Sequence, residues 1–130
     1  MNNQLEQNSF ENVEKPPKKC LFIDDHTSII MGTNFCFKKF TNFKAVECHS
    51  VEEALNAIRA NTPDILFLDH SLTIGGSEGI EIADQIKLEK PEIEIYSTTT
   101  NPHNVMLYEQ RGIKHINKED LSKLEQVITS

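Results

Sequence analysis

The sequence lacks the apolar and basic segments that mark several classes of protein. No stretch approaches the length of a membrane-spanning helix, and the first residues do not follow the basic-then-apolar pattern of a secretion signal. Basic residues are in the minority, because 13 lysines and arginines stand against 20 aspartates and glutamates and leave a net charge of −7. Nucleic-acid-binding domains usually carry a basic surface. We therefore expect a cytoplasmic protein that binds neither a membrane nor a nucleic acid.

Cysteine is also scarce. The three cysteines, Cys20, Cys36 and Cys48, are an odd number and form neither a CxxC pair nor a metal-ligand spacing with histidine. Each lies in a segment that we predict to be a core strand or helix. We therefore predict three buried, reduced thiols, which suits a reducing cytosol.

The chain divides into a polar start and one folded domain. Residues 1–18 are rich in Asn, Gln and Glu and contain Pro16-Pro17, so they cannot bury enough apolar surface to fold. We predict a disordered arm over 1–18. The remainder, 19–130, has the length of a single domain, and a hydrophobic content of 38% over the chain is enough for one core.

Apolar runs alternate with segments of helical periodicity along this domain. Strands are predicted at 20–23, 43–48, 65–68, 93–97 and 113–116, and helices at 27–40, from 51, at 80–88, from 102 and at 119–128. This alternation predicts an α/β fold with a five-stranded, doubly wound parallel sheet. Within the 27–40 helix, Ile29, Ile30, Cys36, Phe37 and Phe40 share one apolar face, with Thr33 as a polar gap.

Local signals predict several helix ends. Ser50 and Glu53 have the spacing of a capping box. Asn101 followed by Pro102 predicts an N-cap and a first helical residue, and Gly112 predicts a helix stop.

Polar side chains follow four of the predicted strands at the point where each strand ends. They are Asp24-Asp25 after the first, Asp69 after the third, the hydroxyl cluster Ser97–Thr100 after the fourth, and Lys118 after the fifth. The carboxyl ends of parallel strands meet at one edge of a sheet, so we expect these groups to converge. Each has an ordinary structural explanation by itself. Together they predict Mg²⁺-assisted phosphoryl transfer onto an aspartate.

The chain resembles the receiver domain of two-component response regulators, over about residues 18–130. Leu21-Phe22-Ile23-Asp24-Asp25-His26 is similar to the family's first strand and acidic pair, and Ile65-Leu66-Phe67-Leu68-Asp69 to its phosphoacceptor strand. The spacing is also similar, with 44 residues from Asp25 to Asp69 and 30 from Asp69 to Thr99. The second interval selects Thr99 as the family's switch hydroxyl.

The resemblance implies a fold, a site and partners. The fold would be flavodoxin-like with strand order 2-1-3-4-5. Asp69 would accept a phosphoryl group from a histidine kinase, a histidine phosphotransfer protein or a small donor such as acetyl phosphate. Mg²⁺ would be bound by Asp25, Asp69 and the main-chain carbonyl of Ser71, and by Asp24 through water, while Thr99 and Lys118 would hold the phosphoryl oxygens.

The resemblance also implies a signalling protein rather than an enzyme. The protein would assist only its own phosphorylation and dephosphorylation. Phosphorylation would switch the surface of the fourth helix, fifth strand and fifth helix for an unknown protein target. Only 12 residues follow Lys118, which indicates a stand-alone receiver, monomeric or dimerising on phosphorylation. Whether it relays, acts as a diffusible effector or stores phosphate stays open.

Three features depart from the family pattern. Leu72-Thr73 replaces the usual Met-Pro, and the loop to Gly79 is two residues longer than usual. The step from Gly112 to Lys118 is one residue short, so that His115 or Ile116 replaces the switch aromatic residue. Glu119, not proline, follows Lys118.

Two alternatives remain. A haloacid-dehalogenase-type phosphohydrolase also uses a strand-end aspartate, but it needs a second one two residues later, where Ser71 stands. A receiver fold could instead bind partners without phosphorylation, as the altered switch region suggests. We interpret His70 and His103 as packing or surface residues.

Overall fold

The computed structural model describes residues 16–130. The strands are β1 (Cys20–Asp24), β2 (Phe43–Glu47), β3 (Ile65–Leu68), β4 (Glu94–Ser97) and β5 (Lys114–His115). The helices are α2 (Thr27–Cys36), α3 (Val51–Asn61), α4 (Glu78–Glu89), α5 (Pro102–Glu109) and α6 (Leu121–Ile128). The prediction of a disordered arm lies, up to residue 15, outside the described residues; residues 16–18 are exposed and belong to no helix or strand.

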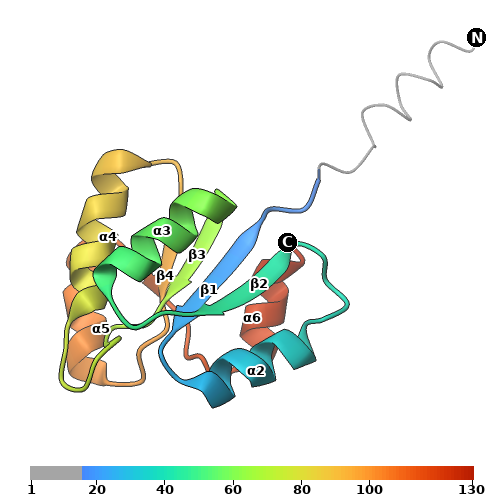
Figure 1. Cartoon of the computed structure of the whole chain (residues 1–130), viewed down its shortest axis with the longest axis horizontal. Coiled ribbons are helices and arrows are strands. Elements are labelled where there is room, and N and C mark those ends of the chain that lie inside the picture. The colour runs from blue at the N-terminus through green and yellow to red at the C-terminus, as the bar shows by residue number, and fades with distance from the viewer. Residues whose placement is uncertain (1–15) are drawn as a thin grey trace, which may run out of the picture.

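The five strands form one parallel sheet in the order β2-β1-β3-β4-β5. Helices α3, α4 and α5 cover one face and α2 and α6 the other (Figure 1). The predicted α/β class, the alternation of strands and helices and the strand order are confirmed. No helix in residues 16–130 is long and apolar enough to cross a membrane.

Strand alternation divides the apolar side chains into two cores. In β1, Leu21 and Ile23 pack toward α3 and α4, whereas Cys20 and Phe22 pack toward α2 and α6. Leu66 and Leu68 follow the first pattern in β3, and Ile65 and Phe67 the second. Because both faces of the central strands are covered, these strands are apolar without interruption.

Two predicted caps are present. The Ser50 hydroxyl accepts a hydrogen bond from the Glu53 N–H at 3.0 Å, while the Glu53 carboxylate accepts from the N–H of His49, one residue before the cap. Asn101 Oδ1 accepts from the His103 N–H at 2.9 Å at the start of α5. Gly112 has a φ of +72° and lies three residues beyond the end of α5.

The prediction for the first helix is wrong in two respects. Helix α2 ends at Cys36 rather than at residue 40, because Phe37 turns inward and packs edge-on against Phe43. Cys36 is exposed, so only Cys20 and Cys48 are buried thiols. Thr33, predicted as the polar gap in the apolar face, is buried in that face, and its hydroxyl donates to the Ile29 carbonyl at 2.8 Å.

Two asparagines make long-range contacts with the main chain. On the outer edge of β2, Asn34 Nδ2 donates to the Ala45 carbonyl at 3.0 Å, and Asn34 Oδ1 accepts from the Ala45 N–H at 2.9 Å. Asn42 Nδ2 donates to the carbonyls of Lys18 at 2.8 Å and Ile128 at 3.0 Å. The first contact pairs an otherwise open strand edge, and the second joins the two ends of the domain.

Candidate functional site

The predicted residues converge where β1, β3 and β4 end. The sheet ladder holds the main chain there, because the Asp69 N–H donates to the Ile23 carbonyl at 3.1 Å and the Thr98 N–H donates to the Leu68 carbonyl at 3.0 Å. A cavity of about 310 Å³ opens at this edge, lined among others by Asp25, His26, Asp69, Ser71, Thr99 and Lys118. The expected convergence of these side chains is therefore observed.

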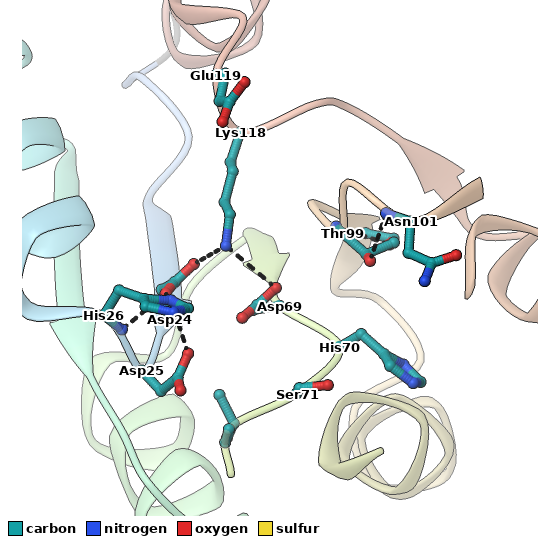
Figure 2. A network of polar contacts seen from close by, with 12 residues as sticks. Asp24, Asp25, His26, Asp69, His70, Ser71, Thr99, Asn101, Lys118 and Glu119 are labelled. Carbon is teal, nitrogen blue, oxygen red and sulfur yellow. Dashed lines mark hydrogen bonds and ion pairs between the residues drawn. The ribbon is translucent and has the colours of Figure 1, made fainter. Parts of the chain in front are cut away.

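Asp24 and Lys118 form a buried ion pair across the sheet. Lys118 Nζ lies 2.8 Å from Asp24 Oδ2 and 3.5 Å from Asp69 Oδ1, and its side chain is 11% exposed (Figure 2). Burial opposes the charge of Lys118, but its contacts with Asp24 and Asp69 outweigh burial and raise the pKa of the ammonium. Lys118 therefore stays protonated and reaches between the two carboxylates.

His26 is a member of the site that the sequence reasoning did not identify. Its Nδ1 lies 2.9 Å from Asp24 Oδ1 and 3.0 Å from Asp25 Oδ1 (Figure 2). The hydrogen bond to Asp24 is the main cause that raises the pKa of the imidazole, against partial desolvation. Its position directly after the acidic pair was the available signal, because an imidazole so placed lies within reach of both carboxylates.

Asp69 is a buried carboxylate with few partners. Burial is the main cause that raises its pKa to about 6, the negative charge of Asp24 adds to this, and Lys118 opposes it. The Asp69 side chain is 9% exposed. It therefore lies inside the protein but faces the cavity, close to the ammonium of Lys118.

The donor set of this acidic cluster suits a divalent cation. One atom each of Asp24, Asp25, His26 and Asp69 lies within 4.8 Å of the others. Both oxygens of Asp24 already accept hydrogen bonds from His26 or Lys118. Asp25 Oδ1 is buried and accepts no directed hydrogen bond from the described residues, its contact with His26 being an ion pair. Asp25 and Asp69 are thus the carboxylates whose oxygens can still accept a hydrogen bond or bind a cation.

Thr99 and Ser71 line the opposite side of the cavity. Thr99 is 5% exposed, and its Oγ1 accepts from the Asn101 N–H at 3.3 Å, which leaves the hydroxyl proton free to be donated (Figure 2). The Ser71 hydroxyl donates to the Gly76 carbonyl at 2.6 Å. A serine used in this way is poorly placed to act as the general acid that a haloacid-dehalogenase-type reaction requires.

The structure distinguishes His115 from Ile116. Ile116 is buried in the core between the sheet and α2 and α6, whereas Ile113 belongs to the opposite core. Strand alternation therefore places His115 on the α5 side of the sheet, next to Ser97 in the strand register. Its Nδ1 is buried and has no hydrogen-bond partner among the described residues. His115, rather than Ile116, stands on the side of α5.

A polar contact links the end of β3 to α5. His70 Nδ1 lies 2.9 Å from the Tyr108 hydroxyl, and the two rings meet edge to face. Burial lowers the pKa of His70, which keeps this imidazole neutral near pH 7. Gly79 lies beside this contact, since a Cβ at this position would overlap the Tyr108 hydroxyl and the Asp69 carbonyl. His70 is therefore a packing residue, as predicted.

The fold and this set of side chains define a receiver-type signalling domain. The family model for the response regulator receiver domain matches residues 20–129. The chain belongs to this family, whose members are the receiver domains of two-component signalling systems and act as phosphoacceptors rather than as conventional enzymes. The resemblance found in the sequence is thus confirmed.

Known proteins agree with this assignment. The chain is 27% identical over 113 residues to the sensory transduction protein LytR of Staphylococcus haemolyticus, covering 85% of this chain and 43% of that protein. It is 28% identical to the transcriptional regulatory protein LytR of Staphylococcus aureus strain N315, covering 85% and 45%. The chain thus spans less than half the length of these curated relatives.

Solved structures share the fold. The receiver domain of NtrX from Brucella abortus has a TM-score of 0.67 at 22% identity, covering 85% of this chain and 98% of that one. The N-terminal signal receiver domain of a two-component response regulator from Bacteroides fragilis has a TM-score of 0.70 at 17% identity, covering 87% and 94%.

Proposed function

We propose that this chain is a phosphoacceptor in which Asp69 takes a phosphoryl group from the phosphohistidine of a histidine kinase or histidine phosphotransfer protein. The observation that carries the proposal is a buried carboxylate that faces a cavity between an ammonium and an acidic pair. An Asp69 oxygen attacks the phosphorus, the P–N bond breaks, and the histidine leaves as the new acyl phosphate forms. With its pKa near 6, Asp69 is mostly ionised at neutral pH and can act as the nucleophile.

The surrounding residues have distinct roles in this proposal. Asp25, Asp69 and the Ser71 carbonyl would hold Mg²⁺, and Asp24 would act through water. When bound, the cation supplies positive charge beside the phosphoryl oxygens. Lys118 and Thr99 would donate hydrogen bonds to those oxygens. The hydroxyl proton of Thr99 is available because its oxygen only accepts in this structure.

Phosphorylation would be transmitted to a protein target through α5, β5 and α6. Thr99 precedes α5 directly, so its movement toward a phosphoryl group displaces the start of that helix. A population shift of this surface needs only a difference in contacts between the two states. We further propose that the folded unit is residues 19–130 and that the protein acts in the cytoplasm.

The intact mass of the untagged protein tests the proposal after incubation with acetyl phosphate, with and without Mg²⁺. We expect one added phosphoryl group that depends on Mg²⁺ and is absent in Asp69→Asn. Asp84→Asn is the matched control, because Asp84 is an exposed partner of Arg111 and does not line the cavity. Phosphorylation of Asp69→Asn would contradict the assignment of the acceptor.

An unchanged mass in the wild-type protein would favour the phosphorylation-independent binding module. Slow transfer or rapid hydrolysis must then be excluded by titrating with beryllofluoride, which mimics the phosphoryl group without a transfer step. Binding of beryllofluoride with Mg²⁺ would keep Asp69 as acceptor, whereas no binding would leave only the binding module.

A further inference from the structure

The loop between β3 and α4 is built around one carboxylate. Glu78, the first residue of α4, accepts a hydrogen bond from the Leu72 N–H at 2.9 Å through Oε1 and another from the Thr73 hydroxyl through Oε2. Gly76 makes room for this carboxylate, because a Cβ there would overlap both Glu78 oxygens and Thr73 Oγ1. The loop therefore closes back onto the residue that begins the next helix.

The start of α4 does not by itself require these contacts. An acidic residue in the first turn stabilises a helix through its position alone, and Glu81 lies in the same first turn. The Glu78 carboxylate instead reaches back to Leu72 and Thr73. Burial raises the pKa of Glu78, but the hydrogen bonds from Thr73 and Leu72 outweigh burial and lower it, so that an ionised carboxylate accepts both bonds at neutral pH.

The first of these bonds fixes a peptide group that also belongs to the acceptor site. The Leu72 N–H and the Ser71 carbonyl are the two polar groups of a single peptide unit. No peptide bond in residues 16–130 is cis, and the N–H and C=O of a trans peptide point in opposite directions. A carboxylate that holds the Leu72 N–H therefore directs the Ser71 carbonyl away from itself.

The side of this peptide group that faces away from Glu78 is the side of the cavity. Ser71 lines the cavity together with Asp25 and Asp69, whereas Glu78 and Leu72 do not. Leu72 is 1% exposed and packs in the core beneath α3 and α4, which anchors the far side of the same peptide. No main-chain N–H in residues 16–130 donates to the Ser71 carbonyl, so this oxygen is not committed to a main-chain hydrogen bond.

We propose that Glu78 is a positioning residue that holds the Ser71 carbonyl in the direction in which it binds Mg²⁺. The inference rests on the proposed function, because it takes that carbonyl as a ligand. Glu78 touches neither the cation nor the acceptor, and it acts only through the Ser71–Leu72 peptide group. Without Glu78 this group can rotate, and the site loses one oriented oxygen. Groups that orient metal ligands typically change metal affinity by about 10–100-fold.

Three variants separate the hydrogen bonds of Glu78 from its charge. Glu78→Ala removes both. Glu78→Gln removes the charge but keeps an amide oxygen that can accept from the Leu72 N–H and an amide nitrogen that can donate to the Thr73 hydroxyl. Gly76→Ala keeps every charge, but its methyl group displaces the carboxylate, which lies at the end of a flexible side chain. Glu81→Ala is the matched control, since Glu81 is an exposed glutamate in the same turn of α4.

The dissociation constant for Mg²⁺ is the decisive quantity, measured by amide NMR titration of the untagged full chain with MgCl₂ at constant ionic strength. We expect it to rise by about tenfold or more in Glu78→Ala and Gly76→Ala. It should stay close to the wild-type value in Glu78→Gln and Glu81→Ala. Hydrogen exchange at the Leu72 amide gives a second readout, and it should become faster only in the two variants that bind Mg²⁺ more weakly.

An unchanged dissociation constant in Glu78→Ala would overturn the inference. Equal weakening in Glu78→Gln or in Glu81→Ala would also overturn it, because the effect would then belong to charge alone. Thermal melts without metal establish which variants are folded, and Gly76→Ala carries the test if Glu78→Ala is not. A lower Tm with an unchanged dissociation constant would make Glu78 a residue of structural importance only.

Failure of the inference and failure of the proposed function are distinguishable. A wild-type protein that binds Mg²⁺ and is phosphorylated, while Glu78→Ala binds Mg²⁺ equally well, refutes only the role of Glu78. A wild-type protein that does not bind Mg²⁺ contradicts the cation site of the proposed function itself.

Discussion

At the scale of single residues, the site consists of charged side chains that the fold buries close together. Asp24 is fully buried, Asp69 is nearly so, and only Lys118 lies directly between them. Two carboxylates and one ammonium leave a surplus of negative charge in a poorly solvated place. The ionised form of Asp69 is therefore less stable than that of an exposed aspartate.

The first prediction concerns the pH dependence of this cost. The pKa of Asp69 is about 6 in the folded protein against an ordinary 3.8, so the folded state holds its proton more tightly. The contribution of Asp69 to the free energy of unfolding therefore falls as the pH rises from about 4 to about 6, and it stays lower above that range. We expect the free energy of unfolding of Asp69→Asn to exceed that of the wild type by about 2 kcal/mol at pH 7.5. The two should be equal near pH 4.

Urea titrations at the two pH values measure this difference. Asp84→Asn serves again as control and should show no gain, since Asp84 is an exposed group paired with Arg111. An Asp69→Asn protein that is less stable than wild type at pH 7.5 would show that Asp69 contributes favourable contacts that outweigh its desolvation.

Gly79 gives a second prediction at the same scale. A Cβ at this position would overlap the Tyr108 hydroxyl and the Asp69 carbonyl, and the Gly79 N–H donates to the His70 carbonyl at 2.8 Å. Gly79→Ala should destabilise the protein by about 1–3 kcal/mol, because neighbouring backbone must move to admit the methyl group. Gly32→Ala should instead be neutral or stabilising by up to about 1 kcal/mol, since Gly32 lies in α2 with open space around it. Thermal melts of both variants test the contrast.

At the scale of elements, the best-predicted features are those with a local cause. The β3 run Ile65–Leu68 and the Ser50 and Asn101 caps follow from neighbouring residues alone, and all were found where expected. The end of α2 depends instead on Phe37 meeting Phe43, a contact that periodicity cannot reveal. Thr33 can occupy the polar gap in the buried face because a helix can satisfy a hydroxyl with its own carbonyls.

The edge of β2 provides the prediction at this scale. Asn34 pairs both main-chain groups of Ala45 on the side that has no neighbouring strand. Asn34→Ala should lower stability by about 1–2 kcal/mol and leave an open edge that another chain can pair with. Asn56→Ala is the control, because Asn56 lies on the exposed face of α3. Urea unfolding and light scattering measure the two effects, and a monomeric variant of unchanged stability would refute this role of Asn34.

At the scale of the whole molecule, the parallel sheet explains why the site could be predicted so fully. Residues far apart in sequence, such as Asp24 and Lys118, meet because each follows a strand of one sheet. Lys118 was expected from its place after β5, but its burial and its contact with Asp24 come from packing that the sequence does not display. His26 was missed because adjacency to Asp25 does not by itself say where the ring points.

The last prediction concerns the effect of Mg²⁺ on the folded protein. A cation that binds only the folded site stabilises it, by about 1.4 kcal/mol at ten times its dissociation constant, which raises Tm by a few degrees. Asp25→Asn should reduce this shift, because it removes the least satisfied carboxylate. Melts with NaCl at matched ionic strength separate site binding from general screening. An equal shift in wild type and Asp25→Asn would place the cation elsewhere.

The contact of Asn42 with Lys18 and Ile128 has a consequence for engineering the molecule. One side-chain amide contacts both Lys18 and Ile128 beside the start of β1, near which the C-terminus lies in Figure 1, whereas the acidic cluster lies where that strand ends. A short peptide that joins residue 18 to residue 130 should therefore be tolerated, with new ends opened in an exposed loop. A circularly permuted chain of this kind should keep the acidic cluster at the other end of the sheet intact.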